Sequence, residues 1–227
     1  MNSKKRLLAI ISLIEKNKKV IDIGTDHGLV PLYLAKNNIS KDILATDISE
    51  SSLNKLVKSL DPRTSKYIKT MVTDGFCGIE KKQGQVAIIA GMGANTIIDI
   101  IEKNMDFSKN LDYMILASNV GNERLREFLL KNSFEICDDF LVYENKKYYD
   151  IIKAKYGEKE NYDLSETYFG KDNIDKHSKL LEKKLAVEYD KNKKFLKDIK
   201  EKSDDKKALH KIELRLEAIS EVYDKWK

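Results

Sequence analysis

The sequence predicts an α/β fold, in which a doubly wound, mostly parallel sheet of seven strands ends in an antiparallel hairpin and is followed by a coiled-coil-like α-helical hairpin. Three observations predict it. Short β-branched runs alternate with amphipathic stretches, two such runs then follow each other closely, and the last third carries helical spacing. We expect two domains, residues 1–155 and residues 156–227, because hydrophobic density falls near Tyr156.

Five continuous apolar runs, bounded by Gly, Asp, Asn or Ser, predict strands that are buried on both faces of a parallel sheet. These runs are Val20–Ile23, Ile43–Ala45, Tyr67–Val72, Val86–Ala90 and Tyr113–Ala117. Helical spacing between them predicts four helices, at Pro31–Lys36, Ser51–Leu60, Asn95–Asn104 and Glu123–Lys131. We expect Ser49 to cap the second of these helices and Pro31 to lie in the first turn of its own helix.

The next two runs predict a hairpin. Phe134–Tyr143 and Lys146–Ala154 are separated only by Glu144-Asn145. Strands this close in sequence pair antiparallel, because a parallel pair needs a long crossover. We therefore expect an antiparallel element at the edge of the parallel sheet.

The C-terminal part carries two apolar stripes. The downstream stripe recurs at intervals of three and four residues, at Leu209, Ile212, Leu216, Ile219, Tyr223 and Trp226. A looser stripe precedes it, at Ile174, Leu181, Leu185, Tyr189, Leu196 and Ile199. Ser203-Asp204-Asp205, between the stripes, suits the cap of the second helix. These patterns predict two long helices that fold back on each other.

Composition narrows the function classes. The 227 residues include 42 Lys and Arg against 37 Asp and Glu, a net charge of +5 that suits anionic partners. The hydrophobic fraction of 41% excludes a wholly disordered chain. The apolar run at Leu7–Ile14 is flanked by charges and is too short to cross a membrane, and no cleavage site follows it. Cys77 and Cys137 lie far apart and only three histidines are present. We expect a cytoplasmic, metal-independent protein without a membrane partner, and we favour a monomer.

The loop after the first predicted strand carries the first candidate chemistry. It reads D-I-G-T-D-H-G from Asp22 to Gly28, and it is neither G-x-G-x-x-G nor a phosphate-binding G-K-[ST] loop. It is closer to D-x-G-x-G-x-G, which class I S-adenosylmethionine-dependent methyltransferases place at this point. Asp26 occupies the position of the middle glycine, and Gly24 permits a tight turn.

Four more strand ends carry candidate residues, since ligands of such sheets bind at the carboxyl ends of the strands. Asp47 suits the two hydroxyl groups of a ribose. Asp74, before Gly75, reaches the cofactor adenine in the methyltransferase interpretation, and forms an Asx turn in the alternative one. Gly91 leaves backbone exposed after the fourth run. Asn119 either bonds a nucleobase edge or caps the next helix.

Together these residues resemble the bacterial tRNA adenine-N1 methyltransferases that modify adenine 22. The resemblance covers nearly the whole sheet domain, through Arg6-Leu7, D-I-G-T-D-H at Asp22–His27, Pro31, Ala45–Asp47, Asp74-Gly75, I-A-G-M-G at Ile89–Gly93, Leu125-Arg126 and Tyr143–Ile151. Two departures occur. Ala94 stands where the family usually has glycine, and Ala117-Ser118 stands before Asn119 where it usually has Gln-Pro. The family also carries a C-terminal coiled-coil extension.

The resemblance implies a Rossmann-like enzyme that transfers methyl groups from S-adenosylmethionine to N1 of an adenine in tRNA. Asp26 is then the candidate catalytic residue, which orients the exocyclic amine and stabilises the cationic base. The candidate cofactor-binding residues are Asp22, Gly24, Thr25, His27, Asp47, Ile48, Asp74, Gly75, Gly91 and Met92. Arg6, His27 and Asn119 are candidate substrate contacts. The helical hairpin, with Lys183-Lys184 and Lys193-Lys194, is a second candidate grip on tRNA.

Two alternatives belong to other classes. One is a catalytically inactive cofactor fold whose helical hairpin docks partners, and the filled cofactor-contact positions weigh against it. The other is an NAD-linked oxidoreductase, which the missing glycine spacing weakens.

Overall fold

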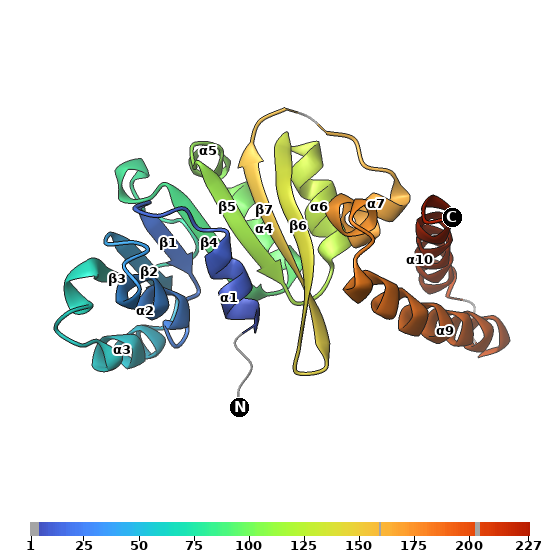
Figure 1. Ribbon diagram of the computed structural model, residues 1–227, viewed down its shortest axis with the longest axis horizontal. Coiled ribbons are helices and arrows are strands. Elements are labelled where there is room, and N and C mark those ends of the chain that lie inside the picture. Colours follow the sequence, from blue (N-terminus) through green and yellow to red (C-terminus); the bar gives the residue numbers. More distant parts are fainter. Residues whose placement is uncertain (1–4, 159, 203–204) are drawn as a thin grey trace. The chain divides into compact units, whose positions relative to one another are not determined.

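The computed structural model describes residues 5–158, 160–202 and 205–227 (Figure 1). The chain forms two compact units. The first comprises Met1–Asp138 and Val142–Glu160, and the second comprises Asp139–Leu141 and Asn161–Lys227. Each unit is described by itself below.

One seven-stranded sheet forms the centre of the first unit. Its strands are β1 (Val20–Ile23), β2 (Ile43–Asp47), β3 (Ile68–Val72), β4 (Val86–Met92), β5 (Tyr113–Ser118), β6 (Phe134–Glu144) and β7 (Lys147–Tyr156). They lie in the order β3-β2-β1-β4-β5-β7-β6. The first five strands are parallel, and β7 pairs antiparallel with β5. The predicted doubly wound sheet with an antiparallel end is confirmed.

Helices connect these strands and bury their apolar faces against the sheet. They are α1 (Lys5–Ser12), α2 (Leu29–Lys36), α3 (Glu50–Ser59), α4 (Ala94–Lys103), α5 (Met105–Lys109) and α6 (Asn122–Lys131), with the 3-10 turns η1 (Ser65–Tyr67) and η2 (Lys81–Gln83). Ser49 caps α3 by accepting a hydrogen bond from the Ser52 N–H at 3.4 Å, as predicted. Pro31 lies in the first turn of α2, also as predicted. The helices α1 and α5 were not predicted.

The turn between β6 and β7 lies one residue later than predicted. Glu144 still belongs to β6, and the turn residues are Asn145 and Lys146. Both have positive φ, 50° and 62°, which is the backbone conformation of a two-residue turn that follows the twist of the strands.

The second unit contains α7 (Leu164–Phe169), α8 (Lys171–Asp175), α9 (Lys179–Lys202) and α10 (Lys206–Lys225). The two predicted long helices are present as α9 and α10, and Arg215 of α10 bonds Glu188 of α9 at 2.5 Å. Asp205 caps α10 by accepting from the N–H groups of Lys207 and Ala208, while Ser203-Asp204 lie outside the described residues.

The structure of this unit differs from the sequence analysis in three respects. The short helices α7 and α8 were missed, and Ile174 belongs to α8 rather than to the first long helix. The downstream stripe is buried at Ile219 but only half-buried at Leu209, Ile212 and Leu216. Lys184, expected on the RNA-facing surface, is buried with 8% of its surface exposed. Its position on α9 therefore does not suit a phosphate contact.

Within the described ranges, no helix has the length and apolar character needed to cross a membrane. Among the same residues, no group of three or more His, Cys, Asp or Glu side chains is arranged to hold a metal ion.

Candidate active site

The candidate site lies at the carboxyl edge of the sheet, where the strand order changes direction. β1 lies between β2 and β4, and both neighbours run parallel to it. The loops that follow these three strands therefore leave the sheet side by side, which is where ligands of such folds bind.

Asp22 is the buried acid of this edge. Only 5% of its surface is exposed, and its Oδ2 accepts a hydrogen bond of 2.6 Å from Thr25 Oγ1. Burial raises the pKa of Asp22 to about 7, with a further rise from the charge of Asp47, while the Thr25 hydrogen bond lowers it. Asp22 and Thr25 thus form one hydrogen-bonded unit under the loop.

Gly24 turns the chain above this pair. Its φ is +70°, and a Cβ added there would lie 2.2 Å from Cε of Met92. The Met92 side chain therefore lies against the backbone of Gly24, and it would have to move if residue 24 carried a side chain. This places Met92 beside the β1 loop, as the candidate cofactor set requires.

Asp26 stands in the left-handed region of the backbone, with φ +48°. That conformation explains why glycine is common at this position and why Asp can replace it. The Asp26 N–H donates to Asp47 Oδ2 at 3.1 Å, and its carboxylate is 3.6 Å from Nε2 of His27. The side chains of Asp26 and His27 are 68% and 61% exposed, so they face solvent at the edge where a substrate would approach.

Asp47 ends β2 and holds two backbone N–H groups. Its Oδ1 accepts from Ser49 at 2.8 Å and its Oδ2 accepts from Asp26. The next residue, Ile48, is 76% exposed although it is a large apolar side chain. The Asp47 carboxylate can accept hydrogen bonds from a diol, and the exposed Ile48 side chain can pack against the face of a planar ring.

Asp74 follows β3 and lies in a turn. Its carbonyl accepts from the Cys77 N–H at 3.1 Å, and its carboxylate is 3.8 Å from Lys103 Nζ. Gly75 has φ +58°, and a Cβ there would lie 3.0 Å from Ile100. Because the Thr73 N–H donates to the Asp47 carbonyl at 3.1 Å, this turn is adjacent to the end of β2.

Gly91 interrupts β4 next to β5. Its φ is +85°, the register with β5 shifts between Ala90 and Met92, and a Cβ added there would meet no atom within 4 Å. Asn119 holds this bulge, because its Nδ2 donates to the Gly91 carbonyl at 2.7 Å and its N–H donates to Met92 at 2.8 Å. Asn119 does not cap α6, whose N-cap is Gly121. That alternative is wrong.

Arg6 lies on α1 rather than on a loop that follows a strand. Its guanidinium is 4.7 Å from the ring centroid of Tyr149, and its backbone N–H donates to Glu144 Oε1 at 3.4 Å. The candidate substrate contact therefore packs on the β6–β7 hairpin.

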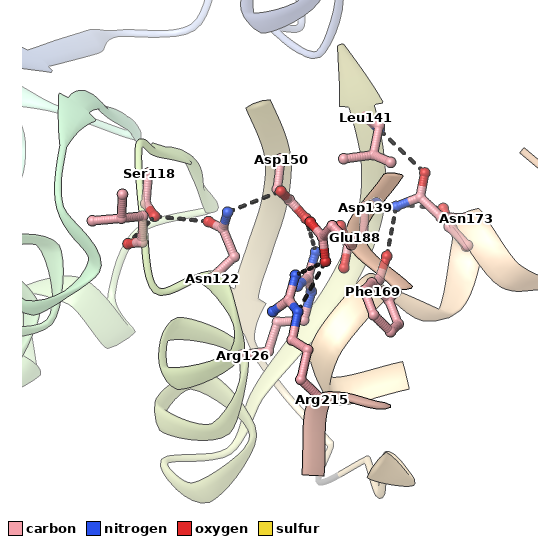
Figure 2. A network of polar contacts seen from close by, with 12 residues as sticks. Ser118, Asn122, Arg126, Asp139, Leu141, Asp150, Phe169, Asn173, Glu188 and Arg215 are labelled. Atoms are coloured by element: carbon pink, nitrogen blue, oxygen red, sulfur yellow. Dashed lines mark hydrogen bonds and ion pairs between the residues drawn. The ribbon is translucent and has the colours of Figure 1, made fainter. Parts of the chain in front are cut away.

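A buried polar network was missed by the sequence analysis (Figure 2). Ser118 Oγ bonds Asn122 Oδ1 at 2.7 Å, Asn122 Nδ2 donates to Asp150 Oδ2 at 2.8 Å, and Arg126 pairs with Asp150 at 2.5 Å. The side chains of Arg126 and Asp150 are 0% and 1% exposed. The spacing of Asn122 and Arg126, four residues apart on one helix face, was the available signal. The network fixes the end of β5 to β7.

Known proteins share this sequence and fold. Residues 3–152 match the family described as "Methyltransferase domain". The chain is 26% identical over 157 residues to the tRNA (adenine(22)-N(1))-methyltransferase of Bacillus subtilis (strain 168), which covers 69% of this chain and 66% of that enzyme.

Two solved structures extend the likeness to the C-terminal helices. A Streptococcus pneumoniae protein, proposed to be a tRNA (m1A22) methyltransferase, is similar with a TM-score of 0.88 and 25% identity over 98% of this chain and 99% of that one. TrmK of M. capricolum, in complex with S-adenosyl-homocysteine, is similar with a TM-score of 0.82 and 25% identity over 98% of each chain. Because the family match spans residues 3–152 and the fold agrees with it throughout the sheet, the chain belongs to the methyltransferase domain family, which confirms the resemblance noted in the sequence.

Proposed function

We propose that the protein transfers a methyl group from S-adenosylmethionine to N1 of an adenine in tRNA, at adenine 22. The observation that carries the proposal is the carboxyl edge of the sheet, where the Asp47 carboxylate, the open bulge at Gly91 and the exposed Asp26 carboxylate belong to adjoining loops. The similarity to tRNA (adenine(22)-N(1))-methyltransferase supports the substrate.

The residues at this edge fit the cofactor. We propose that Asp47 binds the ribose hydroxyls of the cofactor and that Ile48 and Asp74 contact its adenine. The methionine part of the cofactor lies against the backbone of the loops at this edge. The space above Gly91 and the exposed face of Ile48 support these assignments. The full cofactor set that we propose is Asp22, Gly24, Thr25, His27, Asp47, Ile48, Asp74, Gly75, Gly91 and Met92.

When bound, S-adenosylmethionine would supply a methyl group carried on its sulfonium. Adenine N1 has a free lone pair to attack this methyl group, so N1 needs no prior deprotonation. The protein therefore contributes mainly positioning and exclusion of water. Asp26 orients the exocyclic amine of the target adenine and stabilises the positive charge that the base gains. The positive charge of the sulfonium passes to the base with the methyl group, and the Asp26 carboxylate accepts a hydrogen bond from the amine of this cation.

The target atom lies on the Watson–Crick edge, so the adenine must be unpaired when it reacts. We assign contacts with the substrate to Arg6, His27 and Asn119. One Asn119 N–H is bonded to Gly91, and a side-chain amide offers a second N–H and a carbonyl oxygen for a base. We propose that residues 1–155 carry the reaction and that the helical hairpin, within residues 156–227, grips the tRNA. We propose that the protein acts in the cytoplasm, where tRNA is modified.

Three measurements test this function. Isothermal titration should show binding of S-adenosylmethionine and no binding of NAD, which separates the methyltransferase from an oxidoreductase. The purified protein should methylate a tRNA transcript with adenine at position 22 and not one with guanine there. Nucleoside mass spectrometry of tRNA from cells lacking the gene should show less 1-methyladenosine. Cofactor binding without methylation of any tRNA would favour the inactive binding module.

A further inference from the structure

The β6–β7 hairpin extends past the end of β5, on the edge of the sheet that carries the candidate active site (Figure 1). β7 pairs with β5 through Leu116↔Ile152. When this register is continued by two residues along each strand, Asp150 lies opposite Ser118. Asn122 bonds both of these side chains. Residues 144–149 therefore lie beyond the carboxyl end of β5.

The end of this hairpin carries an aromatic pair beside two lysines. Tyr143 and Tyr148 face each other across the turn with ring centroids 4.7 Å apart, and Tyr143 is 40% exposed. Lys146 and Lys147 are exposed. We call these four residues the hairpin tip.

The acidic side chain of this turn is directed away from solvent. Glu144 is only 9% exposed, and it accepts the hydrogen bond from the Arg6 N–H. The Arg6 guanidinium adds a positive charge over Tyr149. The charge that the hairpin tip presents to solvent is therefore positive.

Tyr143 is exposed and Tyr148, which packs on it, is half-buried. An accessible aromatic pair beside lysines matches the chemistry of an unpaired nucleic-acid strand, in which bases stack and phosphates attract cations. A facing tyrosine pair also stabilises a hairpin by itself, but that role does not need two exposed lysines. The tip lies at the same sheet edge as Asp26 and Asn119, so an RNA that delivers a base to this edge passes near it.

We propose that the hairpin tip is an RNA-contacting surface of the sheet domain. Lys146 and Lys147 bind phosphate groups, and the Tyr143–Tyr148 pair stacks on an unpaired base next to the methylated adenine. This inference rests on the proposed tRNA methyltransferase function and adds a contact for the substrate outside the helical hairpin.

The charge contribution is tested with the full-length double variant Lys146→Ala/Lys147→Ala. Its control is Lys81→Ala/Lys82→Ala, which removes two exposed lysines of η2, before the amino end of β4. Binding of a tRNA transcript is followed by fluorescence anisotropy over a salt series. The hairpin variant should bind about tenfold more weakly, and its salt slope should fall by about 1.5, as for two lost phosphate contacts. The control and the affinity for S-adenosylmethionine should match the wild type.

The stacking contribution is tested with Tyr148→Phe and Tyr148→Leu. The Phe variant keeps an aromatic face at residue 148, so its affinity and its KM for tRNA should stay near the wild-type values. The Leu variant keeps an apolar side chain across from Tyr143 but has no aromatic face on which a base can stack. Its tRNA affinity should therefore weaken on the order of fivefold or more. Equal tRNA affinities for the Phe and Leu variants would assign the pair to hairpin stability alone and overturn the stacking role.

The outcomes separate this inference from the proposed function. If the wild-type protein methylates tRNA and the hairpin variants equal it in tRNA affinity and KM, the inference fails and the function stands. If the wild-type protein binds S-adenosylmethionine but neither binds nor methylates tRNA, the function fails. If Lys146→Ala/Lys147→Ala changes the sedimentation coefficient without changing tRNA affinity, the tip contacts a second copy of the chain, which overturns the RNA assignment.

Discussion

The backbone N–H of Asp26 donates a hydrogen bond of 3.1 Å to Oδ2 of Asp47. This bond joins the loop after β1 to the end of β2. Each carboxylate oxygen of Asp47 accepts one backbone N–H and has capacity for a second hydrogen bond. The residue that we assign to the cofactor ribose therefore also positions the backbone of the residue that we assign to the chemistry.

Asp47→Ala should weaken binding of S-adenosylmethionine by about 1.5–3 kcal/mol, more than tenfold, because charge-assisted hydrogen bonds to the ribose are lost. Calorimetric titration measures the change. Asp42→Ala is the matched control, because Asp42 directly precedes the amino end of the same strand and its side chain is exposed. An unchanged dissociation constant for Asp47→Ala would remove the ribose assignment.

Asp22 should make the stability of the cofactor-free protein depend on pH. Its pKa is about 7 in the folded protein and about 4 in an unfolded chain, so between these values the folded state binds a proton that the unfolded state does not. The stabilisation is complete below pH 4 and is lost as pH rises towards 7, by about 1.4 kcal/mol per pH unit.

Urea unfolding at a series of pH values checks this slope. Asp22→Asn keeps an acceptor for the Thr25 hydroxyl and stays neutral, so this contribution to the slope should be absent in the variant. The same slope in both proteins would mean that Asp22 is not the group that titrates.

The buried pair of Arg126 and Asp150 should be essential for stability. Asp150→Ala removes the Asp150 carboxylate from a guanidinium with 0% exposure, which should cost about 3–5 kcal/mol of unfolding free energy. Asp224→Ala removes an exposed partner of Lys227 and should cost less than about 1 kcal/mol. Denaturant unfolding compares the two variants, and equal losses would contradict the burial argument.

Local sequence was sufficient for much of the sheet and of the candidate site. Asp22, Asp47 and Gly91 stand at or next to the ends of continuous apolar runs, and such runs are visible without knowledge of distant contacts. The predicted position of the hairpin turn was wrong by one residue, because Glu144 belongs to β6 although it is acidic.

Contacts between distant segments were not predictable in this way. Asn119 bonds the carbonyl of a residue 28 positions earlier, and Asp150 pairs with a residue 24 positions earlier. The raised pKa of Asp22 needs the burial that only the assembled sheet provides. Short helices such as α7 give weak periodicity, although the capping box from Asp163 to Glu166 was a local signal.

Truncation after Glu160 should leave a domain that binds S-adenosylmethionine but methylates tRNA poorly, because the proposed second grip is removed. The cut is placed there because Glu160 accepts the Ile136 N–H at 3.3 Å and Tyr156 packs on Phe134. The Leu141 N–H loses its acceptor on Asn173, so the melting temperature must be recorded beside the activity. Full methylation by a folded truncated protein would show that the helical hairpin is dispensable for the substrate.

Asp26→Asn should separate a catalytic role of Asp26 from a purely architectural one. Asparagine adopts the left-handed backbone of residue 26 as readily as aspartate, and the backbone N–H to Asp47 does not depend on the side chain. The fold and the affinity for S-adenosylmethionine should therefore remain close to those of the wild type. The carboxylate charge beside His27 is lost, and with it the group that orients the amine and stabilises the cationic base.

The loss should appear in the methyl-transfer step, on the order of 100-fold or more in single-turnover experiments at saturating tRNA and cofactor. A near-normal single-turnover rate for Asp26→Asn would restrict Asp26 to shaping the turn, since Asn makes the same turn contacts. A weakened affinity for S-adenosylmethionine with a normal rate at saturation would instead assign Asp26 to the cofactor site.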